Sequence, residues 1–445
     1  MKKGMVIEMI NLHDISEKGA CVLMREATSL SPFDYGLEYS APVRGTWNIV
    51  HIGMLIPESH QIFVCAQSCL RGVVLTAAEL GAMDRFSTIT IEENNVLDGD
   101  MENLIVEGVT DILDTLTVRP KAVLIYTSCI HHFMATDLKL VYNKLADTFP
   151  EVAFVDCYMN PIMRKSKLSP DTTMRRQLYR LLKPADLRPK QVNLIGNNTM
   201  TDENSELITM LKAGGYKLLD ICSCKTFDEF QTMAKSQANI SFHEAAVAAG
   251  EDLKSRLGQE HLHLTASYEY KIIRENLTRV SEYFKLPLPD FNALEQETED
   301  KIEHTAKLLS GRPIAIDYTA VDQPLGLARL LISRGFTVTA VYADSFVKQE
   351  EESFNWLKEH AGNLKLYGTL HWKMRVLPRD KGPLIAIGQK AAYYTGTDYF
   401  VNLIENDSCF GYHGIKKLMD MMEEAAITPK DTEKIIRVKG WGCCG

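Results

Sequence analysis

The chain has 445 residues, too many for one ordinary hydrophobic core, and this length predicts two or three domains of roughly 100–200 residues each. Hydrophobic residues make up 45% of the chain and charged residues 24%, which is typical of a soluble globular protein. The net charge of −9 argues against a nucleic acid or an anionic membrane surface as the main partner. It leaves room for an interface with a basic patch on a partner protein.

The amino terminus carries Lys2 and Lys3, but the apolar stretch that follows is short and is interrupted by Glu8. This pattern is not that of a signal peptide. No run of about 18 uncharged apolar residues occurs, so we expect no membrane-spanning helix and a cytoplasmic location. In a long cytosolic chain, ten cysteines favour metal binding or redox chemistry over disulfides.

Short β-branched segments alternate with longer helical patterns, which predicts βαβ units and parallel sheets. The first domain is expected over residues 1–190, and its predicted strands are 61–64, 86–92, 122–127 and 152–156. Apolar residues at helical spacing predict helices over 100–116 and 137–148.

A second domain is expected over residues 191–310, because a link containing proline and lysine precedes its first strand. Its further predicted strands are 217–221, 238–242 and 261–264, followed by a long helix over 267–284. A third domain is expected over 311–430, with strands near 336–342, 364–368, 383–388 and 399–403 and a last helix over 415–426. Residues 431–445 form a cysteine-containing tail. The predicted fold class is therefore α/β, with three Rossmann-like domains built on parallel sheets.

Glycine-rich phosphate loops are missing from this pattern. No G-x-G-x-x-G follows a predicted strand, and no G-x-x-x-x-G-K-[ST] occurs. We therefore expect the chain neither to bind a dinucleotide in the usual way nor to hydrolyse ATP itself.

Three cysteines follow predicted strands of the first domain. Cys65 comes directly after 61–64, Cys69 lies four residues further on, and Cys129 follows 122–127 after one intervening residue. Ligands bind at the carboxyl ends of strands in open α/β sheets, so three thiols at this edge would hold iron and sulfur. The C-x-x-x-C spacing predicts that Cys65 and Cys69 share one face of a helix, whose amino terminus favours the thiolate. The alternative interpretation is that all three are buried thiols at strand ends.

Two other places have residue types suited to a site. His243 and Glu244 directly follow the predicted strand 238–242, where they would line a pocket and act in catalysis, although a histidine there is more often a satisfied polar group. The chain ends in Cys443 and Cys444 between glycines. This pair would close over a site as metal ligands or redox thiols, or it is an exposed and incidental pair.

At these residues the sequence resembles the component 1 subunits of nitrogenase and nitrogenase-like reductases. That family includes molybdenum-iron protein chains, cofactor-scaffold proteins and dark-operative tetrapyrrole reductases. The segment from His60 to Cys65 is similar to the family's H-G-P-x-G-C segment, which carries a ligand of the interface iron–sulfur cluster. The segment around Cys129, with Thr136-Asp137 after it, resembles the one that carries the next cluster cysteine. The run 410–414 before a Met-rich last helix is similar to the family's ending.

This resemblance implies that Cys65, Cys69 and Cys129 bind an iron–sulfur cluster, either [4Fe-4S] or a P-cluster-like [8Fe-7S], at a subunit interface. Cys443 and Cys444 would be additional metal ligands. The implied partners are an ATP-dependent iron–sulfur reductase similar to the nitrogenase iron protein and a second component 1 chain, identical or paralogous, in a homodimer or heterotetramer. The implied activity is an oxygen-sensitive reduction of a small-molecule substrate with low-potential electrons. Whether the chain also holds a second metallocofactor is left open by the resemblance.

Two departures from the family pattern limit this reading. The family usually has another cysteine upstream of Cys65, but residues 38–45 contain none. Cys69 or Cys21 would replace it, or the cluster is smaller or shares its ligands differently. Glu244 stands near the position where the catalytic α chain of nitrogenase anchors its cofactor with a cysteine, and the family's cofactor histidine is not evident. We therefore do not expect conventional dinitrogen reduction by this chain alone. The alternatives are a scaffold for metallocofactor assembly and a cluster-free binding protein.

Overall fold

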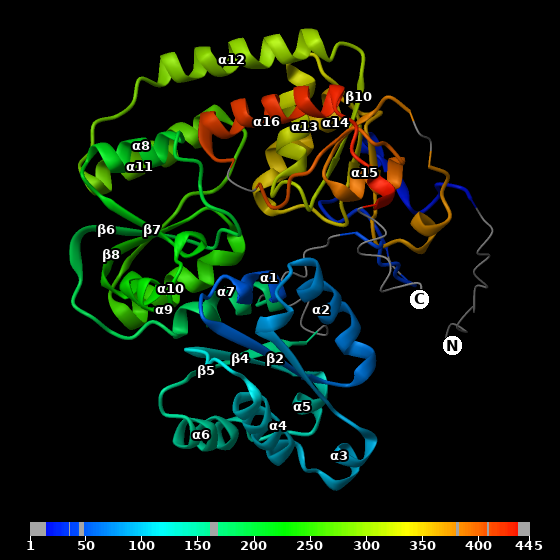
Figure 1. Ribbon diagram of the computed structural model, residues 1–445. Helices are drawn as coiled ribbons and strands as arrows, with labels where there is room; N and C mark the ends of the chain where they lie inside the picture. Colours follow the sequence, from blue (N-terminus) through cyan, green and yellow to red (C-terminus); the bar gives the residue numbers. More distant parts are fainter. Residues whose placement is uncertain are drawn as a thin grey trace, which may run out of the picture. The chain divides into compact units, whose positions relative to one another are not determined.

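The computed structural model describes residues 15–34, 36–43, 49–160, 168–379, 382–406 and 409–434 (Figure 1). The chain divides into two compact units, and each is described by itself. One consists of Met1–Arg44, Gln296–Asn406 and Lys416–Ile436, and the other of Gly45–Glu295, Asp407–Ile415 and Arg437–Gly445. Three sheets made mainly of parallel strands confirm the predicted α/β fold class.

The first sheet lies in the unit that begins at Gly45, and its four parallel strands have the order β3-β2-β4-β5. The strands are β2 (Ser59–Cys65), β3 (Phe86–Thr90), β4 (Ala122–Ser128) and β5 (Ala153–Met159). Every residue of β2 and β4 is buried, as expected of central parallel strands that helices cover on both faces.

The residues of β2 alternate between two hydrophobic cores. Ile62 and Val64 pack into one core with residues of α4 and α6, whereas Phe63 and Cys65 belong to the other core, with residues of α1, α2 and α7. The helices of this region are α1 (Ile49–Met54), α2 (Gln67–Glu79), α3 (Glu93–Asp98), α4 (Met101–Thr115), α5 (Cys129–Phe133), α6 (Leu138–Thr148) and α7 (Pro170–Arg180). This alternation directs Cys65 towards the side of the sheet on which α2 packs.

The second sheet lies in the same unit and also has four parallel strands, in the order β7-β6-β8-β9. The strands are β6 (Arg188–Ile195), β7 (Lys217–Asp220), β8 (Ser236–Ser241) and β9 (Glu260–His263). Its helices are α8 (Glu206–Ala213), α9 (Phe227–Gln231), α10 (Val247–Leu257) and α11 (Tyr270–Phe284). Ile195 and Phe230 of this region belong to the same hydrophobic cluster as Phe63 of the first sheet, so the two sheets share one core.

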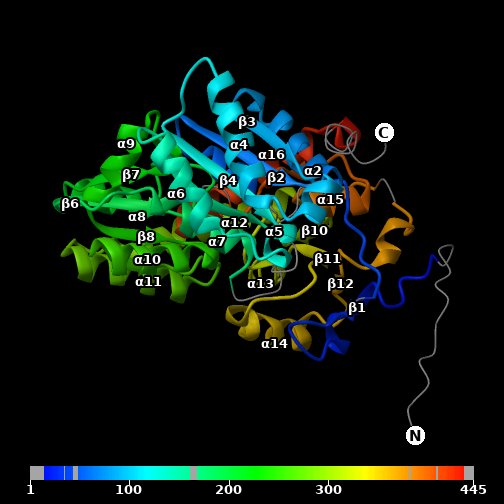
Figure 2. The ribbon, with the colours of Figure 1, turned by 90° about the horizontal axis from the view of Figure 1, so that it is seen from below.

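The third sheet lies in the other unit and has six strands in the order β1-β12-β11-β10-β13-β14. Five are parallel, and β1 pairs antiparallel with β12 at one edge, where Figure 2 shows β1, β12, β11 and β10 in this order. The strands are β1 (Cys21–Leu23), β10 (Pro313–Asp317), β11 (Thr337–Tyr342), β12 (Lys365–Tyr367), β13 (Ile385–Ile387) and β14 (Phe400–Val401). The remaining helices are α12 (Phe291–Leu308), α13 (Pro324–Ser333), α14 (Glu351–His360), α15 (Gln389–Thr395) and α16 (Gly411–Ile427).

Two elements differ from the sequence-based expectation. Residues Cys21–Leu23 were expected within the first domain, but they form β1 in the third sheet. The helix α12 was not predicted between the second and third domains. The domain boundaries at residues 190, 310 and 430 remain predictions. Among the described helices, none is both long enough and apolar enough to cross a membrane.

Candidate functional site

The first sheet has a topological switch point between β2 and β4. The connection after β2 leads through α2 to β3, on one side of β2. The connection after β4 leads to β5, on the opposite side, so the two neighbouring strands β2 and β4 are followed by connections in opposite directions. Ligands of open α/β sheets bind in the crevice at such a point. Cys65 is the last residue of β2 and Cys129 is the first residue after β4, so these two cysteines flank the switch point.

Cys65 is held rigidly in the sheet. Its side chain is fully buried, and its backbone carbonyl accepts a hydrogen bond from the Ile91 N–H at 3.1 Å. Burial, reinforced by the nearby thiols of Cys69 and Cys129, raises the pKa of Cys65 to about 12. The three predicted cysteines therefore lie on neighbouring segments at this end of the sheet.

Cys69 has a different environment, because it is exposed in the first turn of α2. Its backbone N–H donates to the Ala66 carbonyl at 2.9 Å. The prediction that Cys65 and Cys69 share a helical face is wrong, since Cys65 ends the strand and only Cys69 belongs to the helix. Both lie at this end of β2 because only Ala66 separates the strand from α2.

Cys129 is positioned by a reciprocal cap at the start of α5. The Ser128 side chain accepts from the His131 backbone, and His131 Nδ1 accepts from the Ser128 N–H at 3.1 Å. This pairing fixes the turn that leads out of β4 and leaves Cys129 partly exposed. No sequence pattern indicated this capping role of His131.

The thiols form an incomplete set of metal donors. In the ranges that the structure describes, no group of three or more His, Cys, Asp and Glu side chains is arranged to hold a metal ion. Thiols are nonetheless the ligands that iron–sulfur clusters use, and the exposed Cys69 places the set at the surface of its unit. The donor chemistry fits a cluster whose coordination is completed by other ligands. Cys443 and Cys444 lie outside the described residues.

His243 and Glu244 stand at the equivalent switch point of the second sheet, between β6 and β8. His243 is only 6% exposed, whereas the Glu244 side chain is 65% exposed, with Oε2 3.5 Å from His263 Nε2. A Cβ added to Gly196, directly after β6, would lie 2.2 Å from the Ala246 Cβ, so the backbones approach closely here. The predicted catalytic role of His243 and Glu244 stays a prediction.

A hydrogen-bonded chain beside these residues was missed by the sequence analysis. The Ser241 hydroxyl is 2.9 Å from both His261 Nε2 and His263 Nδ1, and His261 Nδ1 is 3.0 Å from Glu251 Oε1. Serine, histidine and glutamate are thus connected as in a nucleophilic triad. Ser241 is fully buried, so a substrate does not reach its hydroxyl, and the chain ties β8, β9 and α10 together.

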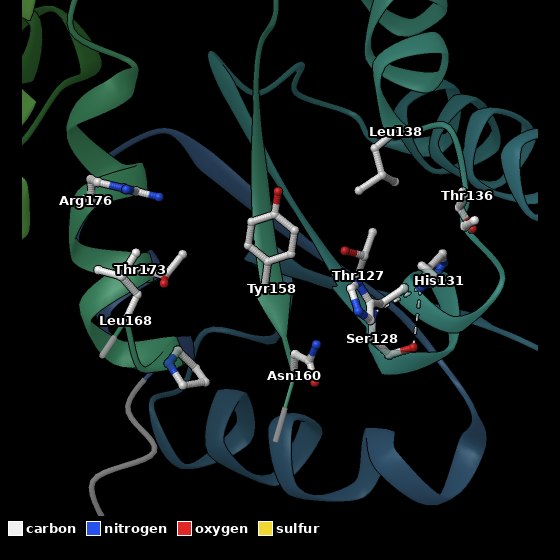
Figure 3. Close-up of a pocket in the computed structure, with 13 residues that line it drawn as sticks. Thr127, Ser128, His131, Thr136, Leu138, Tyr158, Asn160, Leu168, Thr173 and Arg176 are labelled. Atoms are coloured by element: carbon white, nitrogen blue, oxygen red, sulfur yellow. Dashed lines mark hydrogen bonds between the residues drawn. The ribbon is translucent and has the colours of Figure 1, made fainter. Parts of the chain in front are cut away.

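A pocket of about 510 Å³ lies at the carboxyl ends of β4 and β5, next to Cys129 in the chain (Figure 3). Thr127, Ser128 and His131 line it from the β4 side, and Thr173 and Arg176 line it from α7. Burial lowers the pKa of His131 to about 4, so its ring is neutral near pH 7. No sequence pattern indicated this pocket, although it follows directly from the ends of two predicted strands.

The family of the chain follows from comparison with known proteins. The sequence model of the family described as nitrogenase component 1 type oxidoreductase matches residues 50–427, which is most of the chain. No curated protein matches the sequence.

Solved structures show the same fold. A structure of nitrogenase Cp1 at pH 6.5 superposes with a TM-score of 0.65 at 14% identity, covering 90% of this chain and 96% of that one. A second structure, of nitrogenase Cp1 at pH 5, gives a TM-score of 0.54 at 12% identity, covering 92% and 94%. The resemblance noted in the sequence is thus confirmed, and the chain belongs to the nitrogenase component 1 type oxidoreductase family.

Proposed function

We propose that this chain is one subunit of a nitrogenase-like, ATP-dependent reductase complex. In it, Cys65, Cys69 and Cys129 hold part of an iron–sulfur cluster at the interface with a second component 1 chain. A separate iron–sulfur reductase that hydrolyses ATP delivers low-potential electrons. The family match supports the oxidoreductase class, because the matched family is one of oxidoreductases.

The observation that supports this proposal is the placement of three cysteines around the switch point of the first sheet. Cys65 is the last residue of a strand, Cys69 lies in the first turn of α2, and Cys129 begins α5. The backbone at each position is held by hydrogen bonds, but the described side chains are not by themselves arranged to hold a metal ion. A cluster bound there would supply one-electron redox chemistry.

Cys65 and Cys69 would have different roles at this site. Cys65 supplies a donor from the rigid core, where its closed hydrophobic surroundings exclude water. Cys69 supplies a donor from the exposed start of α2, where a second chain has access. A [4Fe-4S] cluster takes four cysteine ligands, so three thiols leave room for one donor from elsewhere. An [8Fe-7S] cluster would need more donors from the partner.

The scaffold alternative is favoured by one observation in the second sheet. Glu244, near the expected place of the cofactor cysteine, is exposed and interacts with His263. A chain without a thiol at that place holds an active-site cofactor less firmly, which would suit a protein that assembles a metallocofactor and releases it.

The test is the iron and acid-labile sulfide content of anaerobically purified protein. We expect wild-type protein to contain both, and Cys65→Ala and Cys129→Ala to lose most of them. Cys224→Ala is the matched control, because Cys224 is a partly buried thiol after β7 that donates to the Asp220 carbonyl at 3.5 Å. Full iron content in both Cys65→Ala and Cys129→Ala would refute the cluster assignment.

Turnover separates the reductase from the scaffold. The iron-loaded protein is mixed with its iron–sulfur reductase, ATP and dithionite, together with candidate substrates. ATP-dependent substrate reduction by this chain supports the reductase. Transfer of a metallocofactor to another component 1 chain, without such reduction, supports the scaffold.

A further inference from the structure

The hydrogen-bonded chain of the second sheet has a buried middle and two accessible ends. The Ser241 hydroxyl is fully buried, and the His261 side chain is 2% exposed. At one end the Glu251 side chain is 64% exposed, and at the other end the His263 side chain is 21% exposed. The chain therefore connects the surface of α10 with the carboxyl end of β9, beside the strand β8 that borders the switch point.

The backbone brings these side chains together. Ser241 and His263 are directly paired across β8 and β9, and His261 lies two residues before His263, so both rings are on one face of the sheet. The helix α10 approaches that face closely, because a Cβ added to Gly250 would lie 2.3 Å from His261 Nε2. Glu251 is the next residue of this helix and reaches the other nitrogen of the same ring.

The direction of the hydrogen bonds is set at the Glu251 end. An ionised carboxylate only accepts, so His261 Nδ1, 3.0 Å from Glu251 Oε1, carries the ring hydrogen. His261 Nε2 is then an acceptor, and the Ser241 hydroxyl donates to it at 2.9 Å. The Ser241 oxygen in turn accepts from His263 Nδ1 at 2.9 Å. The chain thus holds His263 with its hydrogen on Nδ1, and Nε2 is the basic nitrogen of the ring.

The basic nitrogen of His263 lies at the accessible end of the chain. His263 Nε2 is 3.5 Å from Glu244 Oε2, and the Glu244 side chain is 65% exposed in the turn that follows β8. Arg279, from α11, donates to the His263 backbone carbonyl at 2.9 Å and holds the end of the strand. A proton added to Nε2 would lie beside the Glu244 carboxylate and would leave the bond from Nδ1 to Ser241 intact. His263 therefore gains or loses a proton at one atom while its ring stays in place.

We propose that His263 donates protons to a substrate held at the switch point of the second sheet, and that Ser241, His261 and Glu251 are positioning residues that fix its tautomer. This proposal rests on the proposed function, in which low-potential electrons reach such a substrate. The substrate atom that gains electrons takes the proton from His263 Nε2. The N–H bond breaks, a bond from hydrogen to the substrate forms, and His263 returns to the neutral form with its hydrogen on Nδ1. Water restores the proton from the exposed Glu244 side.

Nuclear magnetic resonance of the metal-free, full-length chain with isotope-labelled histidine tests the tautomer directly. The chemical shifts of the ring nitrogens show which nitrogen carries the hydrogen, and His263→Gln identifies the signal by removing it. Spectra are recorded at about pH 8, above the ordinary histidine pKa of about 6.5, so that the rings are neutral. We expect the wild type to carry the hydrogen of His263 on Nδ1.

Remote substitutions along the chain should change this tautomer. Glu251→Ala removes the acceptor that sets the direction, so the hydrogen of His263 should move to Nε2, where it faces the Glu244 carboxylate. Ser241→Ala should have the same effect on His263, whereas His261 should keep its hydrogen on Nδ1. Glu260→Ala is the matched control, because Glu260 directly precedes His261 but its 49% exposed side chain pairs with Lys254 at 2.8 Å. It should leave both tautomers unchanged.

Chemical modification gives a second measurement. Diethyl pyrocarbonate attacks ring nitrogens that carry no hydrogen and that the reagent reaches. In the wild type it should modify His263 and should modify the buried His261 much more slowly, as measured by mass spectrometry of peptides. In Glu251→Ala the rate at His263 should fall several-fold, because the nitrogen without a hydrogen is then Nδ1, which faces the buried Ser241.

Three results would overturn the assignment. One is a wild-type His263 with its hydrogen on Nε2, and another is an unchanged His263 tautomer in a Glu251→Ala protein whose circular dichroism matches the wild type. The third is an equal change of tautomer in Glu260→Ala, which would indicate only a general effect of surface charge. All three are measured on metal-free protein and do not bear on its iron content, so failure here is distinguishable from failure of the cluster proposal.

Discussion

Cys65 and Cys69 are close in the sequence but have opposite environments. Cys65 is fully buried in a core shared with Phe63, whereas Cys69 is exposed on α2. A periodic pattern predicts which residues are apolar, but it does not distinguish two cysteines on either side of a strand–helix junction. This difference determines which thiol a reagent reaches first.

Iodoacetamide should alkylate Cys69 in native, metal-free protein much faster than Cys65, because only the Cys69 sulfur is accessible to the reagent. Quenching at short times, followed by mass spectrometry of tryptic peptides, measures both rates. Protein unfolded in urea is the control, in which the two thiols should react alike. Equal rates in the native protein would show that Cys65 is not in the closed core.

Glu350 is a second residue whose environment has a measurable effect. It is 1% exposed, and its Oε1 accepts from the backbone N–H groups of Leu325 at 2.7 Å and Gly326 at 3.3 Å. Burial raises its pKa from 4.5 to about 8, and these hydrogen bonds offset the effect only in part. The folded protein therefore retains a proton that the unfolded chain loses at lower pH.

The free energy of unfolding should consequently decrease as the pH rises from about 4.5 to about 8, by roughly 1.4 kcal/mol per pH unit from this group. The contribution is fully present below the unfolded pKa and is lost as the pH approaches the folded one. Glu350→Gln should remove this slope, and Glu352→Gln should retain it, because the Glu352 side chain is 73% exposed in the first turn of α14, which follows Glu350. Urea unfolding at several pH values measures both, and equal slopes for Glu350→Gln and wild type would contradict the assignment.

At the scale of elements, all three sheets place functional-looking residues at the same kind of position. The switch points are between β2 and β4, between β6 and β8, and between β10 and β13. Cysteines occupy the first, and His243 follows β8 at the second. At the third, Asp317 ends β10 and accepts the Ala391 N–H at 2.9 Å. Repetition of one βαβ design thus produces three switch points that carry different side chains.

The helix α1 illustrates how closely an element is fitted to its sheet. Two side chains of the sheet hold it: Gln61 Nε2 donates to the Val50 carbonyl at 3.0 Å, and the Tyr126 hydroxyl donates to the Ile49 carbonyl at 3.1 Å. A Cβ added to Gly53 would lie 2.2 Å from the Tyr126 hydroxyl oxygen. The glycine is therefore required by close packing.

Gly53→Ala should lower the free energy of unfolding by about 1–3 kcal/mol, because α1 must move away from β2 and β4. Gly72→Ala is the matched control in α2, where an added Cβ meets no atom within 4 Å. It should raise the free energy of unfolding by about 0.5–1 kcal/mol through higher helix propensity. Urea denaturation followed by circular dichroism measures both changes, and a destabilised Gly72→Ala with an unaffected Gly53→Ala would contradict the packing argument.

Elements that are determined by their own local sequence pattern could be predicted, whereas elements that depend on contacts with distant residues could not. Buried apolar runs predicted β2 and β4 well, because central parallel strands are apolar on both faces. The three-residue strand β1 was not assigned to its sheet, since its partner β12 is far away in the chain and no local pattern encodes that pairing. The pocket was missed for a similar reason: Arg175 and Arg176 are adjacent, and only the rotation of α7 decides that Arg176 lines it.

At the scale of the whole molecule, the proposed site has three cysteines in the described part of the chain, whereas a [4Fe-4S] cluster takes four cysteine ligands. Under this proposal the fourth donor would come either from a second chain or from the tail that contains Cys443 and Cys444. If a second chain supplies the donor, iron binding requires that the two chains assemble. If the tail supplies it, one 50.1 kDa chain holds the whole ligand set by itself.

We expect the iron of anaerobically purified protein to elute from a size-exclusion column with a species larger than the monomer. The proposed interface position of the exposed Cys69 requires a partner chain to complete the ligand set. A double Cys443→Ala, Cys444→Ala variant should keep both its iron and its larger size, as measured by elemental analysis of the fractions and by light scattering. Iron that elutes with the monomer and disappears in the double variant would assign the missing donor to the tail, and the cluster would then be a feature of one chain rather than of an interface.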